Sequence, residues 1–181
     1  MVHTSNGPTP EIKVRRMRPA DCKDAARFCE RMIRWMQKKY LEGTYPREAM
    51  EFDIANHSAK GLAEDIKSPD FFGFLALHDD DVCGIVQGQV YGKSGLAKLT
   101  WVAVDPEHQH EGIGIRLMTA AEEHLRGRGC HKMFLNTLPS LVPAIKLYMK
   151  FGLLPEAYLR KHWWGVDFFV MGKWIGEYRK T

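Results

Sequence analysis

A loop with two closely spaced glycines joins an apolar segment to a long amphipathic one, and this arrangement constrains the fold most. Residues 96–104 are rich in branched and aromatic side chains, which is typical of a strand. Residues 112–128 repeat apolar side chains every three or four positions, which predicts a helix. The loop between them leaves backbone N–H groups without acceptors at a helix N-terminus, where the helix dipole also favours an anion. The segment therefore predicts an anion site best suited to a pyrophosphate.

The glycines of this loop, Gly112 and Gly114, permit close approach of a ligand and torsions that a Cβ would forbid. A dinucleotide-binding fingerprint would need a third glycine where Leu117 stands. A P-loop ending in 92–94 would need its first glycine where Gln87 stands, and no helix follows. The pattern Gln-x-x-Gly-x-Gly after a Val-Asp-Pro strand end fits every defining position, and an ordinary glycine-rich turn is the structural alternative.

The remaining pattern predicts a mixed α/β fold with a mostly antiparallel sheet of seven strands and about four helices. Short turns between residues 71 and 104 indicate an antiparallel meander. We expect residues 1–10 to be a flexible tail and 11–181 to form a single domain. The expected strands are 12–18, 71–78, 82–91, 96–104, 131–136, 153–159 and 167–174, and the expected helices are 21–40, 47–67 in pieces, 112–128 and 142–151.

Composition narrows the classes of function. The 181 residues carry a net charge of +4, which suits an anionic ligand but is too weak to indicate nucleic acid. The sequence has no apolar run long enough for a membrane span and no secretory signal. Four scattered cysteines indicate reduced thiols. We therefore expect a cytoplasmic protein with no membrane and no nucleic-acid partner.

A second motif follows downstream, Ala144-Ile145-Lys146-Leu147-Tyr148-Met149-Lys150-Phe151-Gly152. Together with 109–114 at this separation, the chain resembles the GNAT-type N-acetyltransferases over roughly residues 12–175. The resemblance implies the GNAT-like acyl-CoA N-acyltransferase fold. It also implies transfer of an acetyl group from acetyl-CoA, the cosubstrate, to a primary amine by direct attack in a ternary complex, without a metal.

The resemblance also implies roles for particular residues. The pantetheine arm would pair with the exposed backbone of the strand before the loop, and the pyrophosphate would lie on the loop backbone. Tyr148 would be catalytic, protonating the departing thiolate; an aromatic residue at the edge of a helix contact is the structural alternative. The expected cofactor-binding residues are Val102, Ala103, Val104, Gln109, His110, Glu111, Gly112, Ile113, Gly114 and Ile115.

The general base does not transfer from the family. Leu141 stands where many members carry a cofactor-binding asparagine, Asn136 where some carry a base glutamate, and Lys98 where another subgroup carries a carboxylate. The base is left open between a water relay and one of four acids, Glu42, Glu48, Glu51 and Asp53.

The acceptor is also left open. Acidic and aromatic residues between 40 and 56 would attract a cationic amine, small-molecule or peptide, or would form a solvated loop. Trp163 and Trp164, on alternate faces of an extended segment, would leave one ring exposed as a substrate wall or a homodimer contact. A CoA-binding regulatory module without turnover is the alternative function. No metal site is expected, because the histidines have no ligand spacing and no thiolate pair accompanies them.

Overall fold

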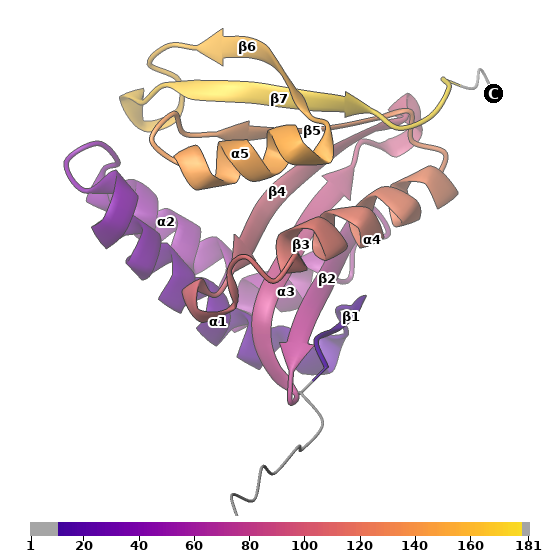
Figure 1. Ribbon diagram of the computed structural model, residues 1–181, viewed down its shortest axis with the longest axis horizontal. Helices are drawn as coiled ribbons and strands as arrows, with labels where there is room; N and C mark the ends of the chain where they lie inside the picture. Colours follow the sequence, from indigo (N-terminus) through magenta and orange to yellow (C-terminus); the bar gives the residue numbers. More distant parts are fainter. Residues whose placement is uncertain (1–10, 179–181) are drawn as a thin grey trace, which may run out of the picture.

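A computed structural model describes residues 11–178 around a mixed sheet of seven strands (Figure 1). The residues expected to form a flexible tail, 1–10, lie outside the described part. The strands lie in the order β1-β2-β3-β4-β5-β7-β6. They are β1 (Lys13–Arg16), β2 (Phe71–His78), β3 (Asp81–Val90), β4 (Leu96–Val104), β5 (Lys132–Thr137), β6 (Leu154–Leu159) and β7 (Phe168–Trp174). The α-helices are α1 (Cys22–Met36), α2 (Arg47–Asn56), α3 (Ala59–Asp65), α4 (Ile113–Gly127) and α5 (Val142–Phe151).

The predicted fold class and the order of elements are confirmed. The segment 47–67 forms two helices: α2 ends at Asn56, and Ser58 caps the start of α3 by accepting the N–H of Gly61 at 3.2 Å. The first helix leaves α geometry at Met36 and continues as a π-helical turn, Gln37–Leu41.

Helices cover both faces of the central strands. Successive side chains of a strand point to opposite faces. Accordingly, Ile85 of β3 belongs to the buried cluster that includes Phe28 of α1, whereas Val86 belongs to the cluster that includes Leu117 of α4. The central strands are therefore buried on both sides, and the amphipathic faces of α1 and α4 hold the sheet from opposite directions.

The sheet opens between β4 and β5, its one parallel pair. These strands pair over three positions, the last joining Lys98 to Phe134, while β4 continues to Val104 and β5 to Thr137. Beyond Lys98, β4 stays with β3 and β5 stays with β7. The edge of β4 that faces β5 is therefore left without a strand partner along the rest of its length.

A β-bulge in β4 coincides with this opening. Gln87 of β3 pairs with Trp101 and the next residue pairs with Leu99, so Thr100 is the extra residue. The hydroxyl of Thr100 donates to the carbonyl of Gln87 at 3.3 Å. A bulge bends a strand and increases its twist, so it directs the second half of β4 away from β5.

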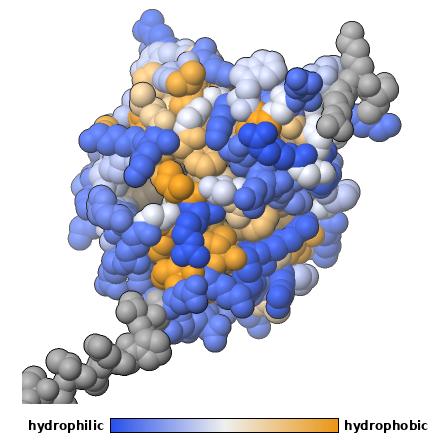
Figure 2. Space-filling model, turned by 45° about the vertical axis from the view of Figure 1, so that its right-hand side comes forward, coloured by the Kyte–Doolittle hydropathy of each residue, from blue (hydrophilic) through white to orange (hydrophobic). Residues whose placement is uncertain are grey.

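The distribution of apolar side chains on the surface and the state of the cysteines agree with the expectations from composition. Figure 2 shows apolar side chains grouped in the middle of one face and surrounded by hydrophilic ones. Within residues 11–178, no helix combines the length and the apolar character that crossing a membrane requires. All four cysteines are buried free thiols, as expected for reduced side chains.

Gly88 tests the importance of the bulge, because a Cβ there would lie 2.1 Å from the carbonyl oxygen of Lys98 and 2.6 Å from the Phe72 ring. We expect Gly88→Ala to lower the free energy of unfolding by about 2 kcal/mol, since backbone must move. Gly127→Ala is the matched control, because nothing lies within 4 Å of its Cβ. It should not lose stability in a helix. Urea unfolding measures both, and equal stability of the two variants would contradict the account.

Candidate active site

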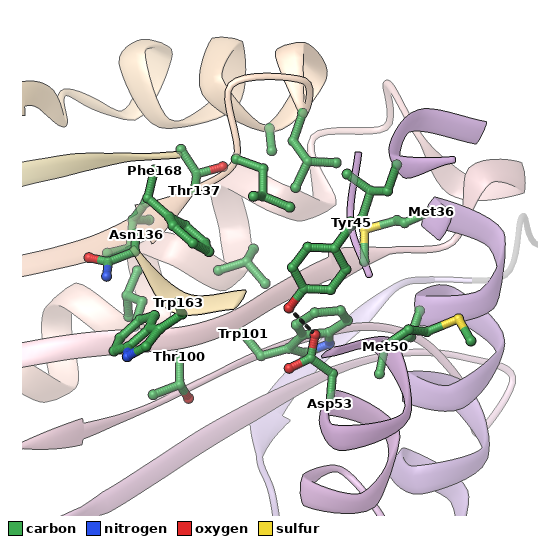
Figure 3. A pocket seen from close by; sticks show the side chains of 18 of the residues that line it. Met36, Tyr45, Met50, Asp53, Thr100, Trp101, Asn136, Thr137, Trp163 and Phe168 are labelled. Carbon is green, nitrogen blue, oxygen red and sulfur yellow. Dashed lines mark hydrogen bonds between the residues drawn. The ribbon is translucent and has the colours of Figure 1, made fainter. Parts of the chain in front are cut away.

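A cavity of about 720 Å³ lies where β4 and β5 separate (Figure 3). Its walls come from α1, the π-helical turn, α2, β4, β5, α5 and the turn between β6 and β7. These elements are distant in sequence, and the opening of the sheet brings them together. The cavity has the size of an ordinary small-molecule site, and most of its lining is apolar or aromatic.

Tyr148, the predicted catalytic residue, lies on α5 and lines this cavity. The side chain is only 6% exposed, and burial raises the pKa of its hydroxyl. Val102 of β4 and Leu141 before α5 line the same cavity. The structure therefore brings Tyr148 next to the unpaired part of β4.

The glycine loop presents free backbone donors. His110 and Gly112 both have positive φ, 71° and 78°, which turns successive peptide groups and forms an anion-binding concavity with the start of α4. Among the residues that the structure describes, the N–H groups of 110–115 have no acceptor. Asp105 fixes the start of the loop, since it accepts the N–H of Glu107 at 3.1 Å and pairs with Arg31 of α1 at 2.6 Å.

The two glycines of the loop have different surroundings. A Cβ on Gly112 would meet nothing within 4 Å, so the space above it is open to a ligand. A Cβ on Gly114 would lie 2.9 Å from Cδ2 of Leu147, a side chain of α5. Gly114 thus permits the close contact of α4 with α5, a role that the sequence analysis did not foresee.

The other predicted cofactor residues contribute backbone. The side chain of Ala103 is buried in the α1 cluster, and that of Val104 packs against the α4 cluster. The side-chain amide of Gln109 donates to the carbonyl of Val104 at 3.5 Å, which ties the loop to the strand end. Ile113 is buried. A ligand in this region would therefore meet main-chain groups.

Among the four acids proposed as base, Asp53 of α2 lines the cavity, whereas Glu42, Glu48 and Glu51 are exposed and do not. The hydroxyl of Tyr45 donates to its carboxylate at 2.8 Å. Burial raises the pKa of Asp53, and the Tyr45 hydrogen bond opposes that shift in part. The cavity thus contains a carboxylate that is a stronger base than one in water.

His57, at the end of α2, supports this wall. Its Nδ1 lies 2.7 Å from the carbonyl oxygen of Asp53. Because a carbonyl only accepts, Nδ1 carries the proton and Nε2 is left without a partner among the described residues. Burial lowers the pKa of His57, so the ring is neutral. Within residues 11–178, no group of three or more His, Cys, Asp and Glu side chains could hold a metal ion.

The tryptophan pair differs from the prediction. Trp163 and Trp164 are 50% and 45% exposed, and both line the cavity. The expectation of one exposed ring was wrong because Trp163–Gly165 is a 3₁₀ turn, with Trp164 at φ 59°, and its side chains do not alternate as in a strand. The rings of Trp164 and Phe52 meet at a centroid distance of 5.6 Å and join the β6–β7 turn to α2. The homodimer contact stays a prediction.

Several lining residues carry no sequence signal. Phe52 of α2 and Met36 of α1 resemble ordinary helix residues, and no spacing relates them to β4. Lys98 was noted only as a departure from the family, yet it lines the cavity with its ammonium 4.5 Å from the Trp163 ring centroid. Only the assembled fold identifies these residues.

Comparison with known proteins identifies the family. The model of the acetyltransferase (GNAT) family matches residues 30–153. The chain therefore belongs to this family, whose members are N-acetyltransferases that use acetyl-CoA. This confirms the resemblance inferred from the two motifs.

Particular proteins are similar to this chain in sequence or in fold. A Bacillus subtilis (strain 168) protein assigned as a ribosomal protein bS18-alanine N-acetyltransferase is 25% identical over 154 residues, covering 80% of this chain and 96% of the relative. The structure of PaiA N-acetyltransferase from Thermoplasma acidophilum, in complex with coenzyme A, superimposes with a TM-score of 0.76 at 21% identity, covering 91% and 99%. The structure of the ribosomal-protein-S18-alanine N-acetyltransferase from Escherichia coli superimposes with a TM-score of 0.68 at 20% sequence identity. The match covers 94% of this chain and 98% of that structure.

The buried carboxylate predicts a dependence of stability on pH. Because the folded-state pKa of Asp53 is raised, its contribution to stability is present below the unfolded pKa and is lost as pH rises through the folded pKa. Asp53→Asn cannot ionise, so we expect a higher Tm than wild type at pH 7, with the difference shrinking near pH 3.5. Thermal unfolding at both pH values measures this. Glu48→Gln, an exposed site on the same helix, should give no gain, and a lower Tm of Asp53→Asn at pH 7 would contradict the account.

Proposed function

We propose that this chain transfers acetyl from acetyl-CoA to a primary amine bound in the β4–β5 cavity, by direct attack in a ternary complex. One observation carries the proposal: the opening of the sheet beyond Lys98 places an unpaired strand edge, Tyr148 and Asp53 around one cavity. The alternative of a binding module without turnover has no use for a basic carboxylate in that position.

The residues present fit the cosubstrate. Acetyl-CoA supplies a thioester that an amine can attack, with the thiolate as leaving group. The free N–H groups of 110–115 and the open space above Gly112 suit the pyrophosphate. The unpaired edge of β4 from Val102 to Val104 offers hydrogen-bonding groups to the amides of an extended arm, as an added strand would.

Asp53 serves the acceptor in this proposal. Its carboxylate binds the incoming ammonium and takes the proton that the amine must lose before it attacks. Burial favours both steps, because it raises the pKa of the carboxyl and strengthens attraction to a cation. Tyr45 holds the carboxylate in place through its 2.8 Å hydrogen bond. Asp53→Asn is therefore expected to combine its gain in stability with a loss of kcat on the order of 10²-fold.

Tyr148 serves the leaving group. Burial raises the pKa of its hydroxyl, so the side chain keeps its proton at neutral pH. Within the described residues no hydrogen bond occupies this hydroxyl, and it is available to a sulfur in the cavity. A hydrogen bond to a developing thiolate is stronger than one to a neutral thioester, so it lowers the barrier.

The acceptor is proposed to be a small amine. The similar proteins include enzymes assigned to the alanine of a ribosomal protein and a spermidine N-acetyltransferase, the SpeG chimera from Vibrio cholerae and hSSAT. In this chain Phe52 and Trp164, each about half exposed, meet at the rim of the cavity. This contact leaves little room for a polypeptide to continue outward between α2 and the β6–β7 turn.

Tyr148→Phe tests the catalytic assignment, since it keeps the ring and removes the hydroxyl. We expect kcat to fall roughly 10²-fold, the low end for lost acid assistance. The Tm and the affinity for acetyl-CoA should change little. Single-turnover measurement isolates the chemical step, and a rate within threefold of wild type would exclude the role, where threefold is roughly 0.6 kcal/mol.

Gly112→Val tests the cofactor site. A branched Cβ would enter the open space above the loop and strain a residue at φ 78°. We expect acetyl-CoA affinity to fall at least ~100-fold. Gly92→Val is the control, because Gly92 also has positive φ, 51°, with nothing within 4 Å of its Cβ, but lies in the β3–β4 turn. Calorimetry should find near-native affinity in the control, and near-native affinity in a folded Gly112→Val would overturn the assignment.

A further inference from the structure

Lys98 is a half-buried cation that the proposed reaction does not use. It is the last residue of β4 that pairs with β5, and it lines the cavity. Its ammonium lies 4.5 Å from the centroid of the Trp163 ring. Desolvation lowers its pKa, and no carboxylate of the described residues lies near enough to oppose that shift. A half-buried charge without an anionic partner is costly, so this lysine is suited to an anion that arrives with a ligand.

The charges of the cavity form a separated pair. Of the described residues that line it, Lys98 is the one Lys or Arg and Asp53 is the one Asp or Glu. Figure 3 shows Trp163, which Lys98 contacts, on one side of the cavity, and Asp53 with Tyr45 on the other. The rest of the lining includes apolar and aromatic side chains, with Phe168 on the side of Trp163 and Trp101 beside Asp53 (Figure 3). A complementary ligand therefore has a positive end, an apolar body and a negative end.

Asn136 adds a second donor on the side of Lys98. It lies on β5, two residues beyond the partner of Lys98, and lines the cavity. Figure 3 shows it on the same side as Trp163. No residue in the described part of the chain forms a hydrogen bond with its side-chain amide. An ammonium and an amide N–H₂ are together suited to the two oxygens of a carboxylate.

We propose that the acceptor is an amine that carries a carboxylate at the far end of an apolar body, with the carboxylate bound by Lys98 and Asn136 and the ammonium at Asp53. This rests on the proposed function and names the class of its substrate. A polyamine would place its second ammonium against Lys98, which repels it. A phosphate would bring two negative charges to a single cation, whereas a carboxylate matches it.

The test compares ligands that differ only in this charge. The probes are para-(acetamidomethyl)benzoate and para-(acetamidomethyl)benzamide, the products expected from the corresponding amines, which lack an amine and so isolate the carboxylate. By calorimetry we expect wild type to bind the acid about 10-fold more tightly than the amide, a typical effect of a hydrogen bond to a charged group. Lys98→Met should abolish this preference, and Lys98→Gln should reduce it if the methionine variant does not fold. Lys93→Met, an exposed lysine in the β3–β4 turn, should retain it.

Turnover gives the second readout. Wild type should acetylate para-aminomethylbenzoate with a higher kcat/KM than para-aminomethylbenzamide, and the ratio should fall about 10-fold in Lys98→Met. Equal affinity for the two products, no binding of the acid, or a ratio unchanged by Lys98→Met would overturn the inference. If the ratio is unchanged and Lys98→Met has a lower Tm than wild type, the role of Lys98 is to pack on Trp163. Acetylation of benzylamine without any preference for the acid would leave the proposed function standing while the inference fails.

Discussion

The site depends on the place at which β4 and β5 stop pairing. Each strand has an antiparallel partner on its other side, β3 for β4 and β7 for β5, so both strands remain paired within the sheet beyond Lys98. Continuous pairing would bring the strands to about 4.8 Å and leave no cavity. The bulge at Thr100 and the close approach at Gly88 direct β4 away from β5. Every feature of the proposed reaction uses the space that results.

The cavity retains polar groups that reduce the stability of the fold. A carboxylate, a lysine and a neutral histidine lie in largely apolar surroundings. Burial raises the pKa of the carboxyl and lowers the pKa of the lysine and the histidine, so it favours the uncharged form of each. Non-glycine residues at positive φ flank the site as well, His110 in the glycine loop and Trp164 in the β6–β7 turn. Such features cost free energy and concentrate at functional sites. At the β6–β7 turn, two hydrogen bonds of the Asp167 side chain help to hold the backbone: it accepts the N–H of Lys161 and the hydroxyl of Tyr158, both at 2.7 Å.

The sequence predicted the features that local pattern determines. Long amphipathic repeats located α1 and α4, short turns indicated the meander, and the two motifs identified the family. The catalytic role of Tyr148 stays a prediction. The sequence indicated Asp53 and Trp163 separately as acceptor-site residues, but it did not predict that they line one cavity with Lys98, because the three residues come from segments that no spacing relates. Two interpretations changed for local reasons. Trp163 and Trp164 lie in a 3₁₀ turn and are not on alternate faces of the connection, and Gly114 faces Leu147 of α5. Both features depend on contacts between segments that are distant in the chain, and local sequence patterns do not predict such contacts.

A crystal structure of the protein with coenzyme A tests the central claim most directly. The account predicts that the pyrophosphate lies on the backbone of residues 110–115 and that the pantetheine arm runs along β4 from Val104 toward Val102. The thiol would then enter the cavity within hydrogen-bond reach of the Tyr148 hydroxyl, on the side of the opening that leads to Asp53. A cofactor bound outside the β4–β5 opening, or a thiol remote from Tyr148, would contradict the account.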